Sequence, residues 1–376
     1  MQELKIFIDR FCEVHDLLKN SVDGVFYRFN EVDIVPGAVY VIGRSQMTQH
    51  LELVRSLVAE NKVHIVFSNP AEGSDTMEGQ FQRVGIRDLV ESRKIMILTG
   101  GDGNPTYRSF KYDSFAHSIC RFEENIQAAS AIDRIFQTSL KPYKFLFLNG
   151  RLREHRKWML ARLRQLGLLE HSLYTCLHSS NVVRGGLKLN DNGVDLLEQV
   201  EPIHYLPPYY EVDAYQERIG APTTENNVKF SLFKNQWGEA YIKPEPYIDT
   251  YFSLVSETVC DAPHSFRTEK IWKPILIGHP WIAIANPGFY RDLRQLGFKT
   301  FNTIIDESFD TIENTQDRLM RISQVVQDLC GSNLQEFLAA CKDICKYNQQ
   351  RLLEYQQQEV DNFPANFVSY LRSETT

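Results

Sequence analysis

The sequence predicts an α/β protein with parallel sheets, divided into two domains. Short apolar runs of the length of buried strands recur along the chain and alternate with segments of helical periodicity. Polar or glycine-containing turns follow these apolar runs, as expected where a strand leads into a helix. The 376 residues are long for one domain and sufficient for two.

The first part of the chain contains three successive strand–helix units, which predict a doubly wound, Rossmann-like domain. A weaker strand at 6–8 and a helix at 11–18 precede them. The three strands are expected at 38–42, 64–67 and 94–98. The helices that belong with them are expected at 46–61 and 79–90, with a linking helix at 121–140. We place this N-terminal domain at residues 1–140.

Two strand-end loops of this domain carry acids that could act as a general base. Glu72 lies in the polar loop 68–75, and Asp102 lies among the glycines of 100–103. A carboxylate at the end of a strand can face a ligand and accept a proton from it. The competing interpretations are a solvated or helix-capping role for Glu72 and a turn role for Asp102. Glu72 is the preferred catalytic candidate.

The second domain is expected at residues 141–355 and begins with a strong strand at 145–148. A basic helix at 152–166 follows, and part of its charge must form a solvated face. Arg151 stands at the junction between this strand and this helix. A guanidinium group there could bind a diphosphate through two parallel hydrogen bonds.

The stretch 252–301 carries the clearest strand–helix–strand–helix pattern of the chain. An apolar strand ends at Ser256, and a short loop leads to a helix that closes at Gly278. Another strand is expected at 281–285. Pro274 predicts a kink, or a helix that starts nearer Lys273. Polar groups that gather at strand ends and helix starts are suited to bind phosphate.

This stretch resembles the donor-binding signature of the alpha-1,3-fucosyltransferase family and related two-domain glycosyltransferases. The signature has a Glu with a neighbouring Ser and, after a gap, a run like FRTEKIWK at 266–273. The order here is Ser-Glu-Thr, whereas the family has Glu-Asn-Ser. The run NGRLREHR at 149–156 also resembles the start of the donor-binding half in phage and bacterial relatives.

The resemblance implies a GT-B type fold, with two Rossmann-like domains and a cleft between them. It implies a nucleotide sugar, GDP- or UDP-linked, as donor. The lysine would contact the phosphates, and the two glutamates would contact ribose and sugar. The implied donor-binding residues are Arg151, Arg153, Ser256, Glu257, Thr268, Glu269 and Lys270.

The end of the chain predicts C-terminal helices. An amphipathic helix is expected at 313–329 and a longer one at 334–360, with a break at 331–333. Pro364 is expected to interrupt the helix before a last segment. We expect the tail 356–376 to pack back across the domains. Between 188 and 206 the sequence predicts an inserted loop with a short helix, and 205–210 is irregular and aromatic.

Composition excludes some classes of function. A net charge of −7 weighs against broad nucleic-acid binding. No apolar run reaches the about 20 residues of a membrane span, and the start has no signal-peptide pattern. Seven cysteines without zinc or CxxC spacing indicate a cytoplasmic protein with reduced thiols. Since no Asp-x-Asp pair and no cluster of metal ligands occurs, we expect no metal and no cofactor.

The sequence therefore predicts a metal-independent, inverting glycosyltransferase that acts on a glycan or lipid-linked saccharide. One alternative is a phage-type glycosyltransferase that modifies hydroxymethylated DNA bases. Another is a non-catalytic module that binds a nucleotide sugar or a partner. Donor turnover would separate the enzymes from the module, and a continuous basic groove would separate DNA from glycan.

Overall fold

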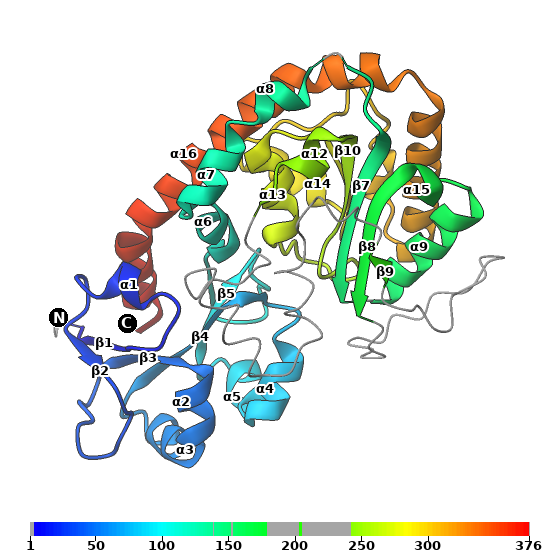
Figure 1. Ribbon diagram of the computed structural model, residues 1–376. Helices are drawn as coiled ribbons and strands as arrows, with labels where there is room; N and C mark the ends of the chain where they lie inside the picture. Colours follow the sequence, from blue (N-terminus) through cyan, green and yellow to red (C-terminus); the bar gives the residue numbers. More distant parts are fainter. Residues whose placement is uncertain (1–3, 138, 152, 179–202, 205–241, 376) are drawn as a thin grey trace. The chain divides into compact units, whose positions relative to one another are not determined.

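The computed structural model describes residues 4–137, 139–151, 153–178, 203–204 and 242–375 (Figure 1). Of residues 150, 151, 175–178, 203 and 204 only the backbone is described. The part expected as an inserted loop and an irregular aromatic stretch therefore lies almost entirely outside the described residues.

The chain forms two compact units, and it passes between them four times. The first unit consists of residues 1–117, 262–267 and 356–376, and the second of residues 118–261 and 268–355. Residues 118–140, which the sequence analysis assigned to the N-terminal domain, belong by their contacts to the second unit. The tail 356–376 belongs to the first unit.

The first unit is built on a six-stranded sheet, coloured blue to cyan in Figure 1, in which all described pairs are parallel. In the order in which they lie side by side, the strands are β2 (Gly24–Phe26), β1 (Ile6–Asp9), β3 (Val39–Gly43), β4 (His64–Gly73), β5 (Met96–Gly100) and β6 (Ser109–Lys111). The chain runs outward from β1 to one edge and from β3 to the other. The topological switch point of this sheet therefore lies between β1 and β3.

Both faces of this sheet are buried, because neighbouring residues of β3 pack into two different cores. Tyr40 and Ile42 join one hydrophobic cluster, and Val39 and Val41 join the other. The second cluster also contains Phe363, Phe367 and Leu371 from the C-terminal helix. Alternation of side chains across a strand explains this split. The continuous apolar run of β3 is the pattern of a parallel strand covered on both faces.

The helices of the first unit are shorter than the periodicity predicts. They are α1 (His15–Leu18), α2 (Arg44–Gln49), α3 (Leu51–Ala59), α4 (Glu78–Val84), α5 (Arg87–Glu91) and α6 (Ser114–Cys120), the last of which runs into the second unit. The helix expected at 79–90 is thus two helices, and Gly85 separates them at φ +81°. Glycine adopts this left-handed conformation without steric cost, so it ends α4 there.

Strand β4 is longer than expected and takes in most of the loop predicted at 68–75. Its pairing with β5 shifts register between Asn69 and Gly73, which indicates a bulge. The prediction that Glu72 lies in a loop is therefore wrong, because this residue is the penultimate residue of the bulged strand. Short edge strands β2 and β6 were not predicted.

The second unit is built on a five-stranded sheet. Side by side its strands are β11 (Trp281–Ile284), β10 (Thr250–Ser256), β7 (Tyr143–Arg151), β8 (Ser172–His178) and β9 (Ile203–His204). The first four are parallel, and β9 is antiparallel to β8. The chain runs outward from β7 to β8 and, in the other direction, from β10 to β11. The switch point of this sheet lies between β7 and β10.

Helices flank this sheet on both faces. The described helices that lie wholly within the second unit are α7 (Glu123–Ala129), α8 (Ile132–Ile135), α9 (Glu154–Gln165), η1 (Leu169–His171), α12 (Glu245–Ile248), α13 (Glu269–Ile277), α14 (Phe289–Gln295), η4 (Ser308–Thr311) and α15 (Thr315–Gly331). Crossover connections are right-handed, and those through α9 and α13 run in opposite directions, so these two helices cover opposite faces. Accordingly, α15 packs against α9 and β11, whereas α13 packs against α7.

Two prolines do not break the helices that contain them. Helix α13 begins at Glu269 and continues through Pro274, so the expected start near Lys273 is wrong. Helix α16 (Leu334–Thr375, orange to red in Figure 1) continues through Pro364, so the expected interruption is also wrong. A proline removes one hydrogen bond from a helix. Burial of apolar side chains around each proline offsets this loss, notably Trp272 in α13 and Phe363 in α16.

The protein therefore has a mixed α/β fold with two mainly parallel sheets, each consistent with a Rossmann-like arrangement. Among the described helices, none combines the length and the apolar character needed to cross a bilayer.

Two helix-ending glycines provide a test of packing against backbone strain. Gly278 and Gly167 both have φ near +70°, after α13 and α9. A Cβ on Gly278 would lie 2.2 Å from Cδ1 of Ile132, whereas a Cβ on Gly167 would meet nothing within 4 Å. Gly167→Ala should cost about 1–2 kcal/mol of unfolding free energy from strain alone. Gly278→Ala should cost about 1–3 kcal/mol more, measured by urea unfolding. Equal losses would show that the space around Ile132 is not limiting.

Candidate functional site

The candidate site lies at the carboxyl ends of β7 and β10, at the switch point of the second sheet. Parallel α/β sheets bind ligands outside such a point. Two helices begin there, α9 after its N-cap residue Arg153 and α13 after its N-cap residue Thr268. The first turns of both helices carry unpaired backbone N–H groups and a partial positive charge. Anions are attracted to this arrangement.

Arg151 is the last residue of β7 and is paired in register with His178 of β8. Its backbone thus lies at the expected junction between strand and helix, and its side chain lies outside the described part. Arg153 is half-buried at the start of α9. Its positive charge acts on the neighbouring Arg156, so it adds to the cationic character of this end of the sheet.

Glu257 is buried directly after β10, and its two oxygens bind groups of the protein. Oε1 accepts a hydrogen bond from the backbone N–H of Thr268 at 3.1 Å, and Oε2 accepts one from the Thr268 hydroxyl at 2.5 Å. The N–H of Thr258 also donates to Oε2 at 3.2 Å. Burial raises the pKa of Glu257, against the opposing charge of Lys270 and the Thr268 hydrogen bonds. Glu257 therefore ties the end of β10 to the start of α13.

Thr268 links this carboxylate to the helix. Its hydroxyl donates to Glu257 and accepts a hydrogen bond from the backbone N–H of Lys270 at 3.4 Å. This is the geometry of an N-cap residue, which satisfies one of the orphan donors of the first turn.

Lys270 holds its ammonium group over the first turn of α13. Nζ donates to a carboxylate oxygen of Glu269 and, at 3.3 Å each, to the hydroxyls of Thr258 and Thr268. The side chain remains 24% exposed, so solvent reaches it. Burial opposes the ionisation of Glu269, but the charge of Lys270 prevails and lowers the pKa of that carboxyl. The pair supplies a charged, solvent-accessible group beside a helix N-terminus.

Two basic residues of α9 bind the end of β10, and the sequence analysis did not predict this structural role. Arg156 donates to the carbonyl oxygens of Ser256 and Glu257 at 2.9 and 3.0 Å, and more weakly to the Ser256 hydroxyl. His155 Nε2 lies 3.1 Å from the Glu257 carbonyl oxygen. Both side chains are buried, although the sequence analysis attributed their cluster to solvent or ligand.

Burial lowers the pKa of both residues, Arg156 and His155. It lowers the pKa of Arg156 to about 10, with Arg153 adding to the effect, so Arg156 stays cationic at neutral pH. It also takes the pKa of His155 well below its ordinary value, with the charge of Arg156 adding to the effect. His155 is therefore neutral and donates to the Glu257 carbonyl through Nε2–H. Arg156 brings one buried positive charge to the end of β10.

The two proposed base candidates of the first unit have different surroundings. Glu72 is half-buried and accepts a hydrogen bond from the Thr76 hydroxyl at 3.0 Å. Burial raises the pKa of the nearby Glu13, and the negative charge of Glu72 adds to this effect. Two carboxylates therefore lie near this end of the sheet. Glu13 follows β1, where the sequence predicts only a helix, and was missed for that reason.

Asp102 is an ion-pair partner. Its oxygens lie 3.2 and 3.3 Å from the guanidinium nitrogens of Arg267 and 3.0 Å from Lys111 Nζ. Burial opposes its ionisation, but the charge of Arg267 prevails and lowers the pKa of Asp102. A carboxylate with a lowered pKa is a weak base, which weighs against Asp102 as a proton acceptor.

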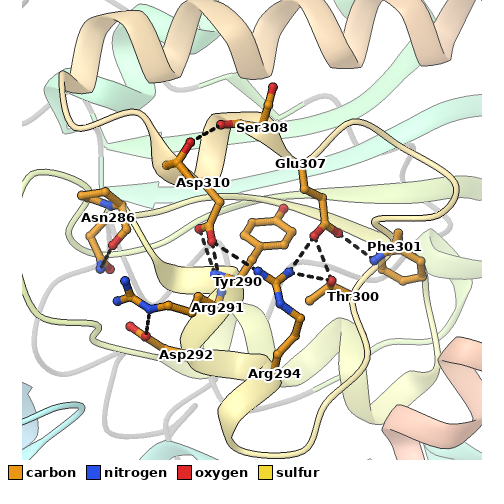
Figure 2. Close-up of polar contacts among 12 residues, drawn as sticks. Asn286, Tyr290, Arg291, Asp292, Arg294, Thr300, Phe301, Glu307, Ser308 and Asp310 are labelled. Carbon is orange, nitrogen blue, oxygen red and sulfur yellow. Dashed lines mark hydrogen bonds and ion pairs between the residues drawn. The ribbon is translucent and has the colours of Figure 1, made fainter.

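A second group of acids, after β11, has a structural explanation. Figure 2 shows Asp310 pointing at the first turn of α14, where it accepts hydrogen bonds from the N–H groups of Tyr290 and Arg291 at 2.9 and 3.0 Å. Glu307 binds Arg294 at 2.9 Å and Thr300 at 2.8 Å. Burial raises the pKa of both carboxyls. These acids hold α14 and the following loop together.

The lowered pKa of Glu269 predicts a pH-dependent contribution to stability. Glu269→Gln should lower the unfolding free energy by about 1–3 kcal/mol near neutral pH, because the ion pair between the buried Glu269 carboxylate and Lys270 is lost. Since the folded pKa lies below the unfolded value of 4.5, this contribution is complete above pH 4.5. It is lost as the pH falls through the lower folded pKa.

Urea unfolding of both proteins over a pH series measures this difference. Glu336→Gln, at an exposed position of α16, is the control for loss of a negative charge from the same unit. A Glu269→Gln penalty that persists unchanged at the acid end of the series would contradict the ionised pair.

Taken together, these groups form a cationic region at a helix N-terminus, which attracts anions. Lys270 and the N-termini of the two helices supply positive charge, and the buried Arg156 adds to it. Comparison of the chain with protein-family models, with curated proteins and with solved structures gave no match.

Proposed function

We propose that this protein is a glycosyltransferase that transfers a sugar from a nucleotide sugar to an acceptor hydroxyl, with inversion and without a metal. One observation carries the proposal: Lys270 and the N-terminus of α13 lie at the switch point of a Rossmann-like sheet. In such a sheet this point is where nucleotides and diphosphates bind. The resemblance of 266–273 to the donor signature of alpha-1,3-fucosyltransferases supports the same interpretation.

In the proposed reaction the second unit binds the donor. The bond between the sugar and the diphosphate breaks, and negative charge collects on the leaving phosphate. Preorganised cations and N–H groups stabilise such charge without reorganising. We assign this role to Lys270, with Arg151 and Arg153 from the start of α9. In a GT-B type arrangement of the two units, the first would bind the acceptor.

The acceptor hydroxyl must lose a proton as it attacks the sugar. We assign the base to Glu72, which is half-buried at the end of β4 and has one described side-chain hydrogen bond. A general base contributes about 10²–10⁴-fold to rate.

The proposal is tested by incubating the purified protein with GDP- and UDP-sugars and measuring release of the nucleotide. Release, alone or with a glycan acceptor, supports an enzyme. Binding of a nucleotide sugar without release under any acceptor condition would favour a non-catalytic binding module.

Lys270→Ala should weaken nucleotide-sugar binding or turnover by about 10-fold or more, because a charge-assisted contact to phosphate is worth about 1.5–3 kcal/mol. The measurement is donor affinity by calorimetry, together with the thermal midpoint. Lys346→Ala is the control, since Lys346 is an exposed lysine of the same unit, paired with Asp133 on the surface. Wild-type affinity in Lys270→Ala would refute the donor assignment.

Glu72→Gln should lower turnover by about 100-fold while donor affinity stays near normal, because the amide keeps the shape of the side chain and loses the basic oxygen. Glu52→Gln, at an exposed position of α3, controls for the loss of charge. If Glu72→Gln turns over like the wild type and Asp102→Asn loses turnover at unchanged donor affinity, Asp102 is the base.

A further inference from the structure

The chain leaves the second unit after Asp261, forms the segment Ala262–Arg267, and returns to the second unit at Thr268. The residues of this segment belong to the first unit, although the chain on either side belongs to the second. The hydrogen bonds from Thr268 to Glu257 close the base of this excursion. What holds the segment therefore bears on where α13 begins.

Arg267 holds the segment through a buried ion-pair cluster in the first unit. Its Nε donates to Asp113 at 3.1 Å, and its two terminal nitrogens donate to the two oxygens of Asp102 at 3.2 and 3.3 Å. The Arg267 side chain is 0% exposed, and that of Asp113 is 1% exposed. The planar fork of a guanidinium group fixes orientation as well as position when it is bound on both sides.

Phe266 is packed against three glycines at the ends of β4 and β5. A Cβ on Gly73 would lie 2.8 Å from Cγ of Phe266, and one on Gly100 would lie 2.9 Å from Cε2 of the same ring. Gly101 has φ +65°, and its Cβ would lie 2.4 Å from the Ser265 carbonyl oxygen. The glycine-rich turn at 100–103 thus makes room for this segment.

Hydrogen bonds of Ser265 and His264 complete the attachment. The backbone N–H of Asp102 donates to the carbonyl oxygen of Ser265 at 2.8 Å. His264 places Nδ1 at 3.1 Å from both oxygens of Asp75 and donates its backbone N–H to the same carboxylate at 3.2 Å. We call the contacts of His264, Phe266 and Arg267 with the first unit the anchor.

We propose that the anchor positions the donor site, so that Arg267, Asp102 and Asp113 are positioning residues for Thr268, Glu269 and Lys270. Only one peptide bond separates Arg267 from the N-cap residue of α13, and a peptide unit has fixed dimensions. A displacement of Arg267 therefore acts on the N-cap residue through a link of fixed length. Displacements of about 1 Å at a binding or catalytic group can cost about 100-fold in activity. The nucleotide part of this inference rests on the proposed function.

The first experiment measures amide hydrogen exchange in the full-length protein without ligand. The reporters are the backbone N–H groups of Thr268 and Lys270, both hydrogen-bonded at the start of α13. Gly73→Ala displaces Phe266 without changing charge, and Gly79→Ala is its matched control, because a Cβ there meets nothing within 4 Å. We expect at least about 10-fold faster exchange of the reporters in Gly73→Ala only.

A second pair of variants removes charge. Asp102→Asn keeps the shape of the side chain and weakens the Arg267 pairing. Asp88→Asn removes the partner of Arg55 in an exposed pair of the same unit. The reporters should exchange faster in Asp102→Asn only. If Gly73→Ala does not fold, Asp102→Asn decides alone, since Asp102 is 29% exposed and its replacement is isosteric.

The second experiment measures binding of GDP and of UDP by calorimetry. Both anchor variants should bind the preferred nucleotide about 10-fold more weakly than their controls. If the anchor variants exchange faster and the wild type binds no nucleotide, the anchor positions the start of α13 but the proposed function is refuted. Wild-type exchange and wild-type nucleotide affinity in folded anchor variants would overturn the inference.

Discussion

The candidate site depends on one constraint, the burial of the Glu257 carboxylate at the end of β10. A buried carboxylate is tolerated only where donors surround it. Here the donors are the N–H of Thr258 and the N–H and hydroxyl of Thr268, so the chain has to return to Glu257 after the excursion at 262–267. That return fixes the first residue of α13. The place of Lys270, the second residue of this helix, follows from it.

The two positive charges near Glu257, those of Arg156 and Lys270, have different surroundings. Arg156 is buried and binds carbonyl oxygens at the end of β10, so it holds the backbone and contributes a fixed positive field. Lys270 is partly exposed and is bound to Glu269, so its ammonium is positioned yet reachable. A solvated ammonium alone would have to be ordered when a phosphate binds. Preorganisation of this kind reduces the cost of binding.

Sequence reasoning predicts β3, β5, β7 and β11 well, because these strands are short apolar runs bounded by polar turns. It misses β2 and β6, which are three-residue edge strands without a pattern of their own. It also does not predict where one expected helix is divided into two, as at Gly85, whose left-handed conformation ends α4. For the site, it places Lys270 at a helix start, and it names Thr268 only through the resemblance of 266–273. It does not reveal that Arg156 is buried, since a basic helix start has the same composition in solvent and in a core.

Asp102 illustrates why the remaining errors arise. Three glycines around it suggest a turn, and a carboxylate at a strand end suggests a base. Its actual partner, Arg267, is 165 residues away along the chain, and that distance hides the pairing from any local pattern. The pairing explains the glycines and the lowered pKa together, because the same segment brings Phe266 against the glycines and Arg267 against the acid. Strand-end polar residues in this fold thus serve either to hold a distant segment or to meet a ligand. A buried partner identifies the first role, and Arg267 places Asp102 in that group.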